Sequence, residues 1–236
     1  MRPDKPAIEM TARELAKYID QSVLKPEFSE AEIRKYIIEG IDFGCRTVCI
    51  NPASLDIAAE LTSGTETEIC VVCDFPFGLS TTRSKVMQAE EYCRRGDIFE
   101  LDIVSNYGWI RSGKWDLMRD ELKAVSDVCH QHNTALKTIL ETDALTLDQI
   151  LQACEIVIEA GSDFVKTSTG FYTGGKSEGA TIELVRAMME KVKGRCKIKG
   201  SGAIRTREHF LTLIDMGIDR MGIGYKSTPI VLGISQ

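Results

Sequence analysis

The sequence has no apolar run of the roughly 18 residues that a membrane-spanning helix requires. It also has no excess of positive charge, and a formal net charge of −6 gives no support for binding nucleic acid by bulk attraction. The opening residues, Met1 to Lys5, contain no apolar core of a signal peptide, so a cytoplasmic location is expected. Because no linker or low-complexity tract interrupts the chain, residues 1–236 are expected to form a single domain.

Cysteine is plentiful, but its pattern argues against a metal or redox centre. Most of the eight cysteines lie in apolar runs, which predicts buried thiols in a reducing compartment. Cys70 and Cys73 have the C-x-x-C spacing of redox and zinc sites. They fall within a predicted strand, however, where residues three apart point to opposite faces. The two thiols are therefore not expected to converge, and no metal site is predicted.

Strand-like and helix-like runs alternate along the whole chain. Short apolar runs predict strands at Ser22–Leu24, Thr47–Ile50, Glu68–Cys73, Phe99–Val104, Ala135–Leu140, Phe164–Lys166, Cys196–Lys199 and Arg220–Gly222. The clearest helical patterns are at Glu30–Phe43, Thr82–Arg95, Trp115–Gln131, Leu147–Ala160, Thr181–Lys193 and Arg207–Met216. Strands and helices that alternate in units of roughly 30 residues predict an α/β fold, a single (β/α)₈ TIM barrel. A doubly wound open sheet is the alternative layout.

Two lysines end neighbouring predicted strands, and each is followed by a glycine-bearing polar loop. Lys166 lies in Phe164-Val165-Lys166-Thr167-Ser168-Thr169-Gly170, and Lys199 lies in Lys197-Ile198-Lys199-Gly200-Ser201-Gly202. Burying an ammonium group without a partner is costly, so packing alone seldom places lysine there. Two ammonium groups held close together lower one another's pKa, which leaves a neutral amine able to attack a carbonyl. The pattern indicates Schiff-base chemistry, and the alternative is two solvated lysines.

An acidic residue interrupts another predicted strand. Asp102 lies in Phe99-Glu100-Leu101-Asp102-Ile103-Val104 and shares strand parity with Glu100. Lys137 is similarly embedded in an apolar run. Charges of this kind are rarely left unpaired, so Asp102 is expected to join a buried network with one or more inward lysines. A purely structural role for that network is the alternative.

Glycines also cluster after the last strands, at Gly170, Gly202, Gly222 and Gly224. In TIM barrels, loops at these places often bind phosphate through backbone N–H groups, so a phosphorylated small substrate is expected.

A competing motif is present, because Gly170–Ser177 matches the P-loop pattern G-x-x-x-x-G-K-S of nucleotide hydrolases. It follows the sixth strand rather than an early one, and Gly179 would begin the next helix poorly.

These segments together resemble the deoxyribose-phosphate aldolases, a branch of the class I lysine-dependent aldolases. Phe164–Phe171 resembles the Schiff-base motif of that family, Lys199–Thr206 the motif of its second lysine, and Glu100–Val104 the segment with its aspartate. Further similar stretches are Asp20–Pro26, Val48–Pro52, Phe75–Gly78 and Lys137–Thr142. The sequence departs from the family in its longer Gly174–Gly179 stretch, in its eighth-strand loop, and in ending without a tyrosine.

The resemblance implies an enzyme that cleaves 2-deoxyribose 5-phosphate reversibly and needs no metal or organic cofactor. Lys166 would form the Schiff base, Lys199 would lower its pKa, and Asp102 would transfer protons. Residues expected to bind the sugar hydroxyls or the phosphate are Ser22, Asn51, Thr169, Gly170, Gly202, Arg205, Gly222 and Gly224. A homodimer is also implied. The alternatives left open are a related aldolase for another sugar phosphate, a nucleotide hydrolase, and a non-catalytic sugar-phosphate-binding protein.

Overall fold

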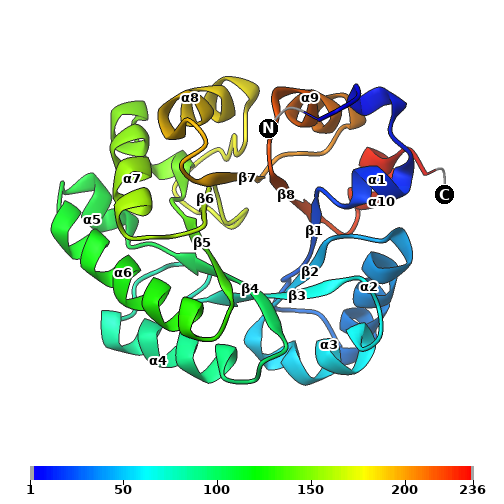
Figure 1. The fold of residues 1–236 in the computed structure, drawn as a ribbon, viewed down its shortest axis with the longest axis horizontal. Helices are drawn as coiled ribbons and strands as arrows, with labels where there is room; N and C mark the ends of the chain where they lie inside the picture. The colour runs from blue at the N-terminus through cyan, green and yellow to red at the C-terminus, as the bar shows by residue number, and fades with distance from the viewer. Residues whose placement is uncertain (1–2, 235–236) are drawn as a thin grey trace.

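The short apolar runs of the sequence form parallel strands, and these strands close into a barrel in the order β1 to β8. The computed structural model describes residues 3–234. The strands are β1 (Ile19–Val23), β2 (Thr47–Ile50), β3 (Glu68–Cys73), β4 (Ile98–Val104), β5 (Ala135–Ile139), β6 (Phe164–Lys166), β7 (Lys197–Ser201) and β8 (Arg220–Gly224). Figure 1 shows them as a central ring with the helices outside. The predicted (β/α)₈ TIM barrel is therefore confirmed, and the open sheet is not formed.

The two strands whose pairing closes the barrel, β1 and β8, have bounds that differ from the predicted ones. β1 begins at Ile19, three residues before the predicted start, and β8 continues to Gly224. The start of β1 was not predicted because the strand contains two polar residues, Asp20 and Gln21, and both are fully buried in the structure. A buried carboxylate is tolerated there because Arg220 of β8 donates to it, with Nη1 2.6 Å from Asp20 Oδ1.

Helices cover the outer face of the barrel. The main ones are α2 (Glu30–Phe43), α3 (Leu55–Thr62), α4 (Thr82–Cys93), α6 (Trp115–Gln131), α7 (Leu147–Glu159), α8 (Ile182–Val192) and α9 (Arg207–Met216), and shorter ones are α1 (Ala12–Ala16), α5 (Tyr107–Arg111) and α10 (Thr228–Leu232). Capping boxes at Thr11 and Ser29 begin α1 and α2. Gly44 and Gly217 end α2 and α9 in the left-handed conformation that a side chain disfavours. None of the helices in residues 3–234 is long and apolar enough to cross a membrane.

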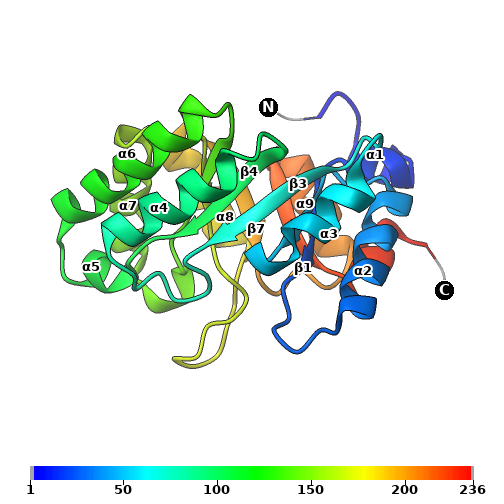
Figure 2. The ribbon, with the colours of Figure 1, turned by 90° about the horizontal axis from the view of Figure 1, so that it is seen from below.

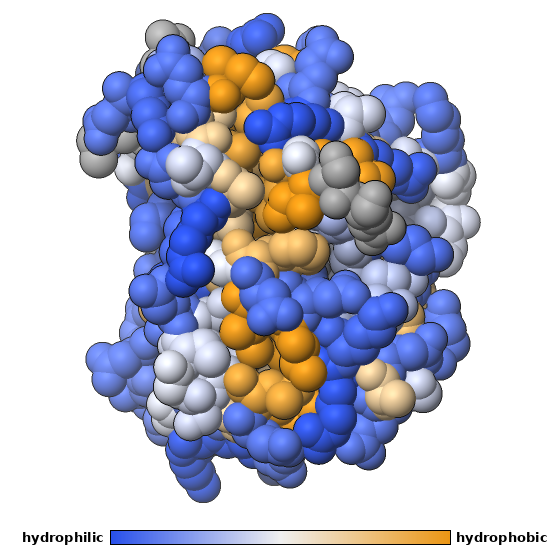
Figure 3. All heavy atoms as spheres, turned by 90° about the vertical axis from the view of Figure 1, so that its right-hand side faces the viewer, coloured by the Kyte–Doolittle hydropathy of each residue, from blue (hydrophilic) through white to orange (hydrophobic). Residues whose placement is uncertain are grey.

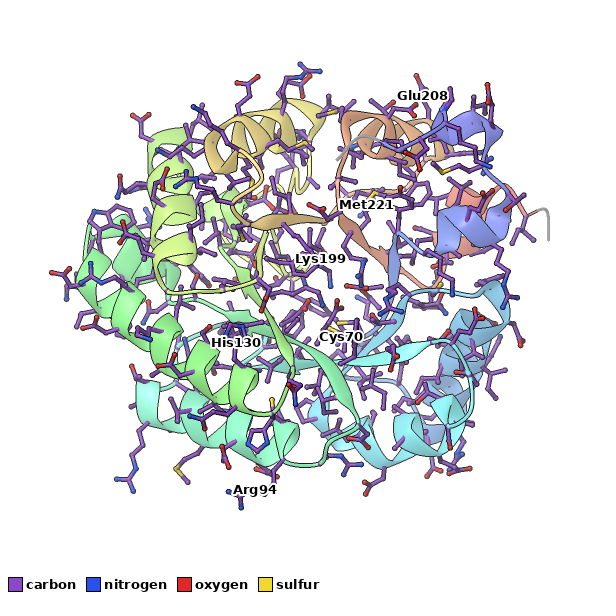
Figure 4. The ribbon with its side chains drawn as sticks, viewed as in Figure 1. Cys70, Arg94, His130, Lys199, Glu208 and Met221 are labelled. Atoms are coloured by element: carbon purple, nitrogen blue, oxygen red, sulfur yellow. The ribbon has the colours of Figure 1, made fainter. Side chains whose placement is uncertain are left out.

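The main core lies between the strands and the surrounding helices, whereas the barrel interior holds polar groups. Alternation along β3 illustrates this division, because Cys73 joins the outer core while Cys70 faces inward toward Asp102. The prediction that these two thiols point to opposite faces is confirmed. In Figure 4, Cys70 and Lys199 lie within the ring of strands, whereas Arg94 and Glu208 point outward.

Parallel strands bring all their carboxyl ends to one end of the barrel. Figure 2 shows the loops after β1 and β6 on the same side of the molecule, with the long loop after β6 extending farthest. Polar residues that end these strands are therefore gathered at one mouth, as the barrel architecture requires.

Candidate active site

Asp102 of β4 lies at the centre of a buried cluster of lysines. Its Oδ2 atom is 2.6 Å from Lys166 Nζ and 2.8 Å from Lys199 Nζ, while Oδ1 is 3.0 Å from Lys137 Nζ. Lys166 and Lys199 are register partners on β6 and β7, so their side chains project side by side. The structure thus brings together the three predicted catalytic residues, and it adds Lys137 on the side of the barrel away from the mouth.

The cluster continues below this layer through an arginine that sequence reasoning missed. Arg220 Nη1 is 2.6 Å from Asp20 Oδ1 and 3.1 Å from Glu100 Oε2. Lys199 Nζ lies 2.5 Å from Asp20 Oδ2, and Lys137 contacts Glu100. Each member of the network is more than nine-tenths buried. It contains three carboxylates, Asp20, Glu100 and Asp102, and four basic groups, Lys137, Lys166, Lys199 and Arg220.

Burial and ion pairing act in opposite directions on these groups. Burial disfavours the carboxylate of Asp102, yet the ammonium groups of Lys137, Lys166 and Lys199 outweigh it and hold the pKa of Asp102 well below its ordinary value. Burial likewise disfavours the ammonium of Lys199, but Asp102 and Asp20 raise its pKa above the usual range. Lys199 is therefore a fixed positive charge beside Lys166 at neutral pH.

A cavity of about 230 Å³ opens at the barrel mouth above this network. Among the residues predicted to bind the substrate, those that line it are Ser22, Thr169, Gly170, Gly202, Arg205, Gly222 and Gly224. Gly222 packs tightly here, because a Cβ at this position would lie 2.7 Å from Ser201 Oγ and 3.4 Å from Lys199 Cε. Gly222 of the cavity lining therefore packs against Lys199 of the buried network, although Asp102, Lys166 and Lys199 are not themselves lining residues.

Asn51 is the predicted substrate-binding residue that does not line this cavity. Its side-chain nitrogen donates to the carbonyl oxygen of Leu24 at 3.2 Å, so the amide holds the loop after β1. Lys25 of the same loop lines the cavity and was missed, and Ser227 of the eighth-strand loop lines it as well. Lys25 Nζ lies 5.2 Å from the ring centroid of Phe171, within range of a cation–π interaction. Only its position after a strand could have suggested Lys25.

Thr169 is held by an acidic residue of the neighbouring strand end. Its hydroxyl donates to Glu141, and its backbone nitrogen lies 3.3 Å from Glu141 Oε1. Burial is the main reason that the pKa of Glu141 is raised. This arrangement fixes the Thr169 hydroxyl at the cavity edge.

The Gly170–Ser177 segment does not adopt the arrangement expected of a nucleotide-binding loop. Helix α8 begins only at Ile182, and Lys176 is 85% exposed beside Glu178. The amides of Glu178 and Gly179 donate to Asp143 Oδ1 at 2.8 and 3.1 Å. The two amides that directly follow the segment are therefore bonded to a carboxylate and are not free to bind a phosphate group.

Two overlapping groups of buried side chains have the spacing of metal ligands, one of Cys49, Cys70 and Asp102 and the other of Asp20, Cys70 and Glu100. The ligand atoms of Cys49, Cys70 and Asp102 lie within 4.8 Å of one another, and all three side chains are buried. The Asp102 oxygens already accept from ammonium groups, and Lys137 Nζ lies 3.4 Å from Cys70 Sγ. Three neighbouring positive charges oppose the entry of a cation, so this group is poorly suited to hold a metal ion.

The chain was compared with known proteins. The model of the DeoC/LacD family of aldolases matches residues 14–227. The deoxyribose-phosphate aldolase of Mannheimia succiniciproducens is 41% identical over 213 residues, which cover 90% of this chain and 92% of that protein. The solved structure of the aldolase QR15 is 38% identical, with a TM-score of 0.83 over 92% of this chain and 94% of its own. A tetrameric deoxyribose phosphate aldolase from Aeropyrum pernix is 25% identical, with a TM-score of 0.83 over 94% of this chain and 91% of its own.

Proposed function

Because the chain belongs to the DeoC/LacD family of aldolases, we propose that it cleaves 2-deoxy-D-ribose 5-phosphate reversibly to D-glyceraldehyde 3-phosphate and acetaldehyde. The observation that carries the proposal is the position of Lys166, which is 2% exposed at the end of β6 and contacts the buried carboxylate of Asp102. A lysine in this setting is suited to form an imine, which acts as the electron sink for carbon–carbon cleavage.

The proposed reaction begins when the neutral amine of Lys166 attacks the aldehyde carbon of the open-chain sugar. Loss of water then gives a protonated imine. Asp102, acting through a water molecule, accepts the proton of the 3-hydroxyl group while the C2–C3 bond breaks and its electrons pass to the imine. Glyceraldehyde 3-phosphate leaves, and the remaining enamine is protonated at C2 and hydrolysed to acetaldehyde. Lys199, which contacts the same oxygen of Asp102, is positioned to share the transferred proton.

The contacts of the buried network distinguish Lys166 from the other basic groups. Three carboxylates face four basic groups, so one proton must be lost before the positive and negative charges balance. Unbalanced charge is costly in a buried site. Lys166 is the basic member that contacts a single carboxylate of the network, whereas Lys137, Lys199 and Arg220 each contact two or more. We therefore propose that Lys166 is the member of the network that reacts with the substrate.

The polar residues of the cavity are suited to hold the rest of the substrate. We propose that the backbone at Gly170, Gly202, Gly222 and Gly224 donates to the phosphate, with Arg205 as its counter-ion. Lys25 and Ser227 add a second cation and a hydroxyl group to this lining. Ser22 and Thr169 are placed to contact sugar hydroxyls, and Asn51 supports the loop after β1.

Covalent trapping tests the proposal directly. Wild-type protein incubated with acetaldehyde and borohydride is expected to gain one reduced adduct, which peptide mass spectrometry places on Lys166. Lys166→Ala should show neither the adduct nor cleavage of the sugar phosphate, because the nucleophile is gone. A non-catalytic binding protein would bind the sugar phosphate without being trapped, and trapping at another lysine would contradict the assignment.

Two further expectations are proposals of the same kind. We propose a homodimer, and Figure 3 shows apolar side chains gathered on the face with α1, α2 and α10, where Ile38 and Ile230 are exposed. Sedimentation velocity of wild type and Ile230→Asp tests this, and the tetramer from Aeropyrum pernix is the competing assembly.

The cytoplasmic location agrees with eight cysteines that are all free and buried, and cell fractionation would test it.

A further inference from the structure

Cys70 has a thiol neighbour inside the barrel, which is Cys49 rather than Cys73. Cys49 of β2 and Cys70 of β3 are register partners on adjacent parallel strands, and both are fully buried in a small cluster separate from the outer core. Their sulfur atoms lie within 4.8 Å of one another. Neighbouring strands run about 4.8 Å apart, which falls within the Cα separation of about 4.4–6.8 Å that a disulfide tolerates. The positions of the two strands therefore permit a bond between the two sulfur atoms.

The surroundings of the pair make the two thiols chemically unequal. The Cys70 thiol and the positive charge of Lys199 outweigh burial and lower the pKa of the Cys49 thiol. Burial, together with Cys49 and Asp102, raises the pKa of Cys70 well above its ordinary value. The Cys70 thiol donates to Asp102 Oδ1 at 3.2 Å. Cys49 is therefore the thiol suited to attack an oxidant, because the thiolate is the nucleophile, and Asp102 is placed to accept the proton of Cys70.

A small oxidant can reach this pair by the route that the substrate takes. Leu24 packs in the same cluster and also lines the cavity. Lys166 acts on the Cys49 thiol through its charge, and Lys166 must itself be reached by the sugar phosphate. A route wide enough for a sugar phosphate also admits a molecule as small as hydrogen peroxide.

We propose that Cys49 and Cys70 form a reversible disulfide that switches the enzyme off in the presence of hydrogen peroxide. The Cys49 thiolate attacks one oxygen of the peroxide, so an S–O bond forms, the O–O bond breaks, and the leaving hydroxide takes up the proton of Cys49 to give water. Cys70 then gives its proton to Asp102 and attacks the sulfur of the Cys49 sulfenic acid. The S–S bond forms, the S–O bond breaks, and the second hydroxide takes the proton from Asp102. Two thiols are thus oxidised to one disulfide, and one hydrogen peroxide is reduced to two water molecules.

The disulfide is expected to lower the activity because it changes the surroundings of Asp102. Oδ1 of Asp102 accepts from Cys70 Sγ at 3.2 Å and from Lys137 Nζ at 3.0 Å, and a disulfide sulfur has no proton to donate. Oδ2 of the same carboxylate lies 2.6 Å from Lys166 Nζ. A shift of this carboxylate therefore alters the contacts of the amine that forms the imine. This regulation rests on the proposed function, whereas formation of the disulfide does not.

Treatment of the full-length wild-type protein with hydrogen peroxide, ended by adding catalase, tests the proposal. Peptide mass spectrometry without reductant should find Cys49 joined to Cys70, and the intact protein should lose the mass of two hydrogen atoms. Cleavage of the sugar phosphate should fall on the order of tenfold or more, since small displacements of catalytic groups have effects of this size. Dithiothreitol should reverse all three changes, because an excess of a dithiol reduces a disulfide by thiol exchange.

Two serine variants separate this pair from the other thiols. Cys70→Ser removes the second thiol, so no joined peptide should form and oxidised Cys49 should proceed to sulfinic acid, which dithiothreitol does not reverse. Cys93→Ser is the matched control, because Cys93 Sγ lies 4.0 Å from Cys129 Sγ in the outer core. This variant should keep both the loss of activity and its recovery.

The proposal is overturned if wild type gives no Cys49–Cys70 peptide, if Cys93 and Cys129 are joined instead, or if the joined enzyme keeps its activity. If Cys70→Ser does not fold, the wild-type peptide map and the recovery of activity decide the question. Untreated wild type that does not cleave the sugar phosphate would instead refute the proposed function, and the peptide map would still decide whether the disulfide forms.

Discussion

Arg220 donates to Asp20 across the seam where β8 meets β1, with 2.6 Å between Nη1 and Oδ1. The pair joins residues 200 positions apart in the chain, and it connects closure of the barrel to the buried network around Asp102. Residues that never reach the cavity therefore contribute to the charge felt by Lys166.

Opposite charge changes in this network should move the pH dependence of the enzyme in opposite directions. Glu100→Gln removes a negative charge, so the Lys166 ammonium loses its proton more readily and the acid limb of kcat/KM should move to lower pH. Arg220→Gln removes a positive charge and should move that limb to higher pH. Shifts on the order of one pH unit are expected for groups at this range. Shifts of both variants in the same direction would contradict the charge-balance argument.

The positive charge of Lys199 is expected to matter more than its shape. Lys199→Leu removes a fixed cation that contacts the same oxygen as Lys166, so the pH–rate profile should move to higher pH and the maximal rate should fall. Lys199→Arg keeps the charge and should keep the profile closer to that of wild type. The check is kcat/KM measured between pH 5 and pH 10. An unchanged profile in Lys199→Leu would remove Lys199 from this role.

A second buried ion pair, outside the barrel, is expected to control stability. Lys85 Nζ lies 2.6 Å from Glu121 Oε1 and 3.0 Å from the carbonyl oxygen of Val104, and the Lys85 and Glu121 side chains are almost fully buried. Lys85→Met leaves Glu121 buried without its partner and should lower the free energy of unfolding by about 3–5 kcal/mol.

Urea denaturation followed by circular dichroism measures that loss. Lys123→Met is the matched control, because Lys123 pairs with Asp127 on an exposed face and should contribute less than about 1 kcal/mol. The double variant Lys85→Met/Glu121→Leu should recover much of the stability, since both charges are then absent. Equal losses in Lys85→Met and Lys123→Met would show that burial does not decide the cost.

Close backbone packing at Gly179 predicts a selective effect on the cavity. A Cβ at this position would collide with the backbone of Gly202, which lines the cavity, and φ is +62°. Gly179→Ala should therefore raise the KM for the sugar phosphate, by tenfold or more if Gly202 moves by about 1 Å. Gly64→Ala has a similar φ of +76° but no atom within 4 Å, so it should cost about 1–2 kcal/mol of stability without changing KM. A KM for Gly179→Ala equal to that of wild type would show that the contact is adjustable.

Local sequence patterns were sufficient to predict the barrel and to place Lys166 and Lys199 at neighbouring strand ends, but they did not reveal long-range partners. The apolar run before Lys166 marks a strand end in any open or closed sheet, and parity along β4 placed Glu100 and Asp102 on one face. Arg220 was missed because its partners lie on β1 and β4, and closure of the barrel sets those contacts. Asn51 was expected to contact the substrate because it follows β2, yet its side-chain amide donates a hydrogen bond to the nearby carbonyl oxygen of Leu24. The position of a residue along a strand predicts where its side chain lies in the barrel. It does not predict which neighbouring side chain that residue contacts.

The carboxylate of Asp143 fixes one part of the loop after β6 by hydrogen bonds, and another part is exposed. It anchors Ser177, Glu178 and Gly179, so the segment near the cavity is fastened while Lys176 remains exposed in solvent. Extra residues grafted between Gly174 and Lys176 would lengthen only the free part. This position is accordingly suited to carry a peptide tag or a surface-immobilisation handle, at the open end of the barrel and without a change in the residues that meet the substrate.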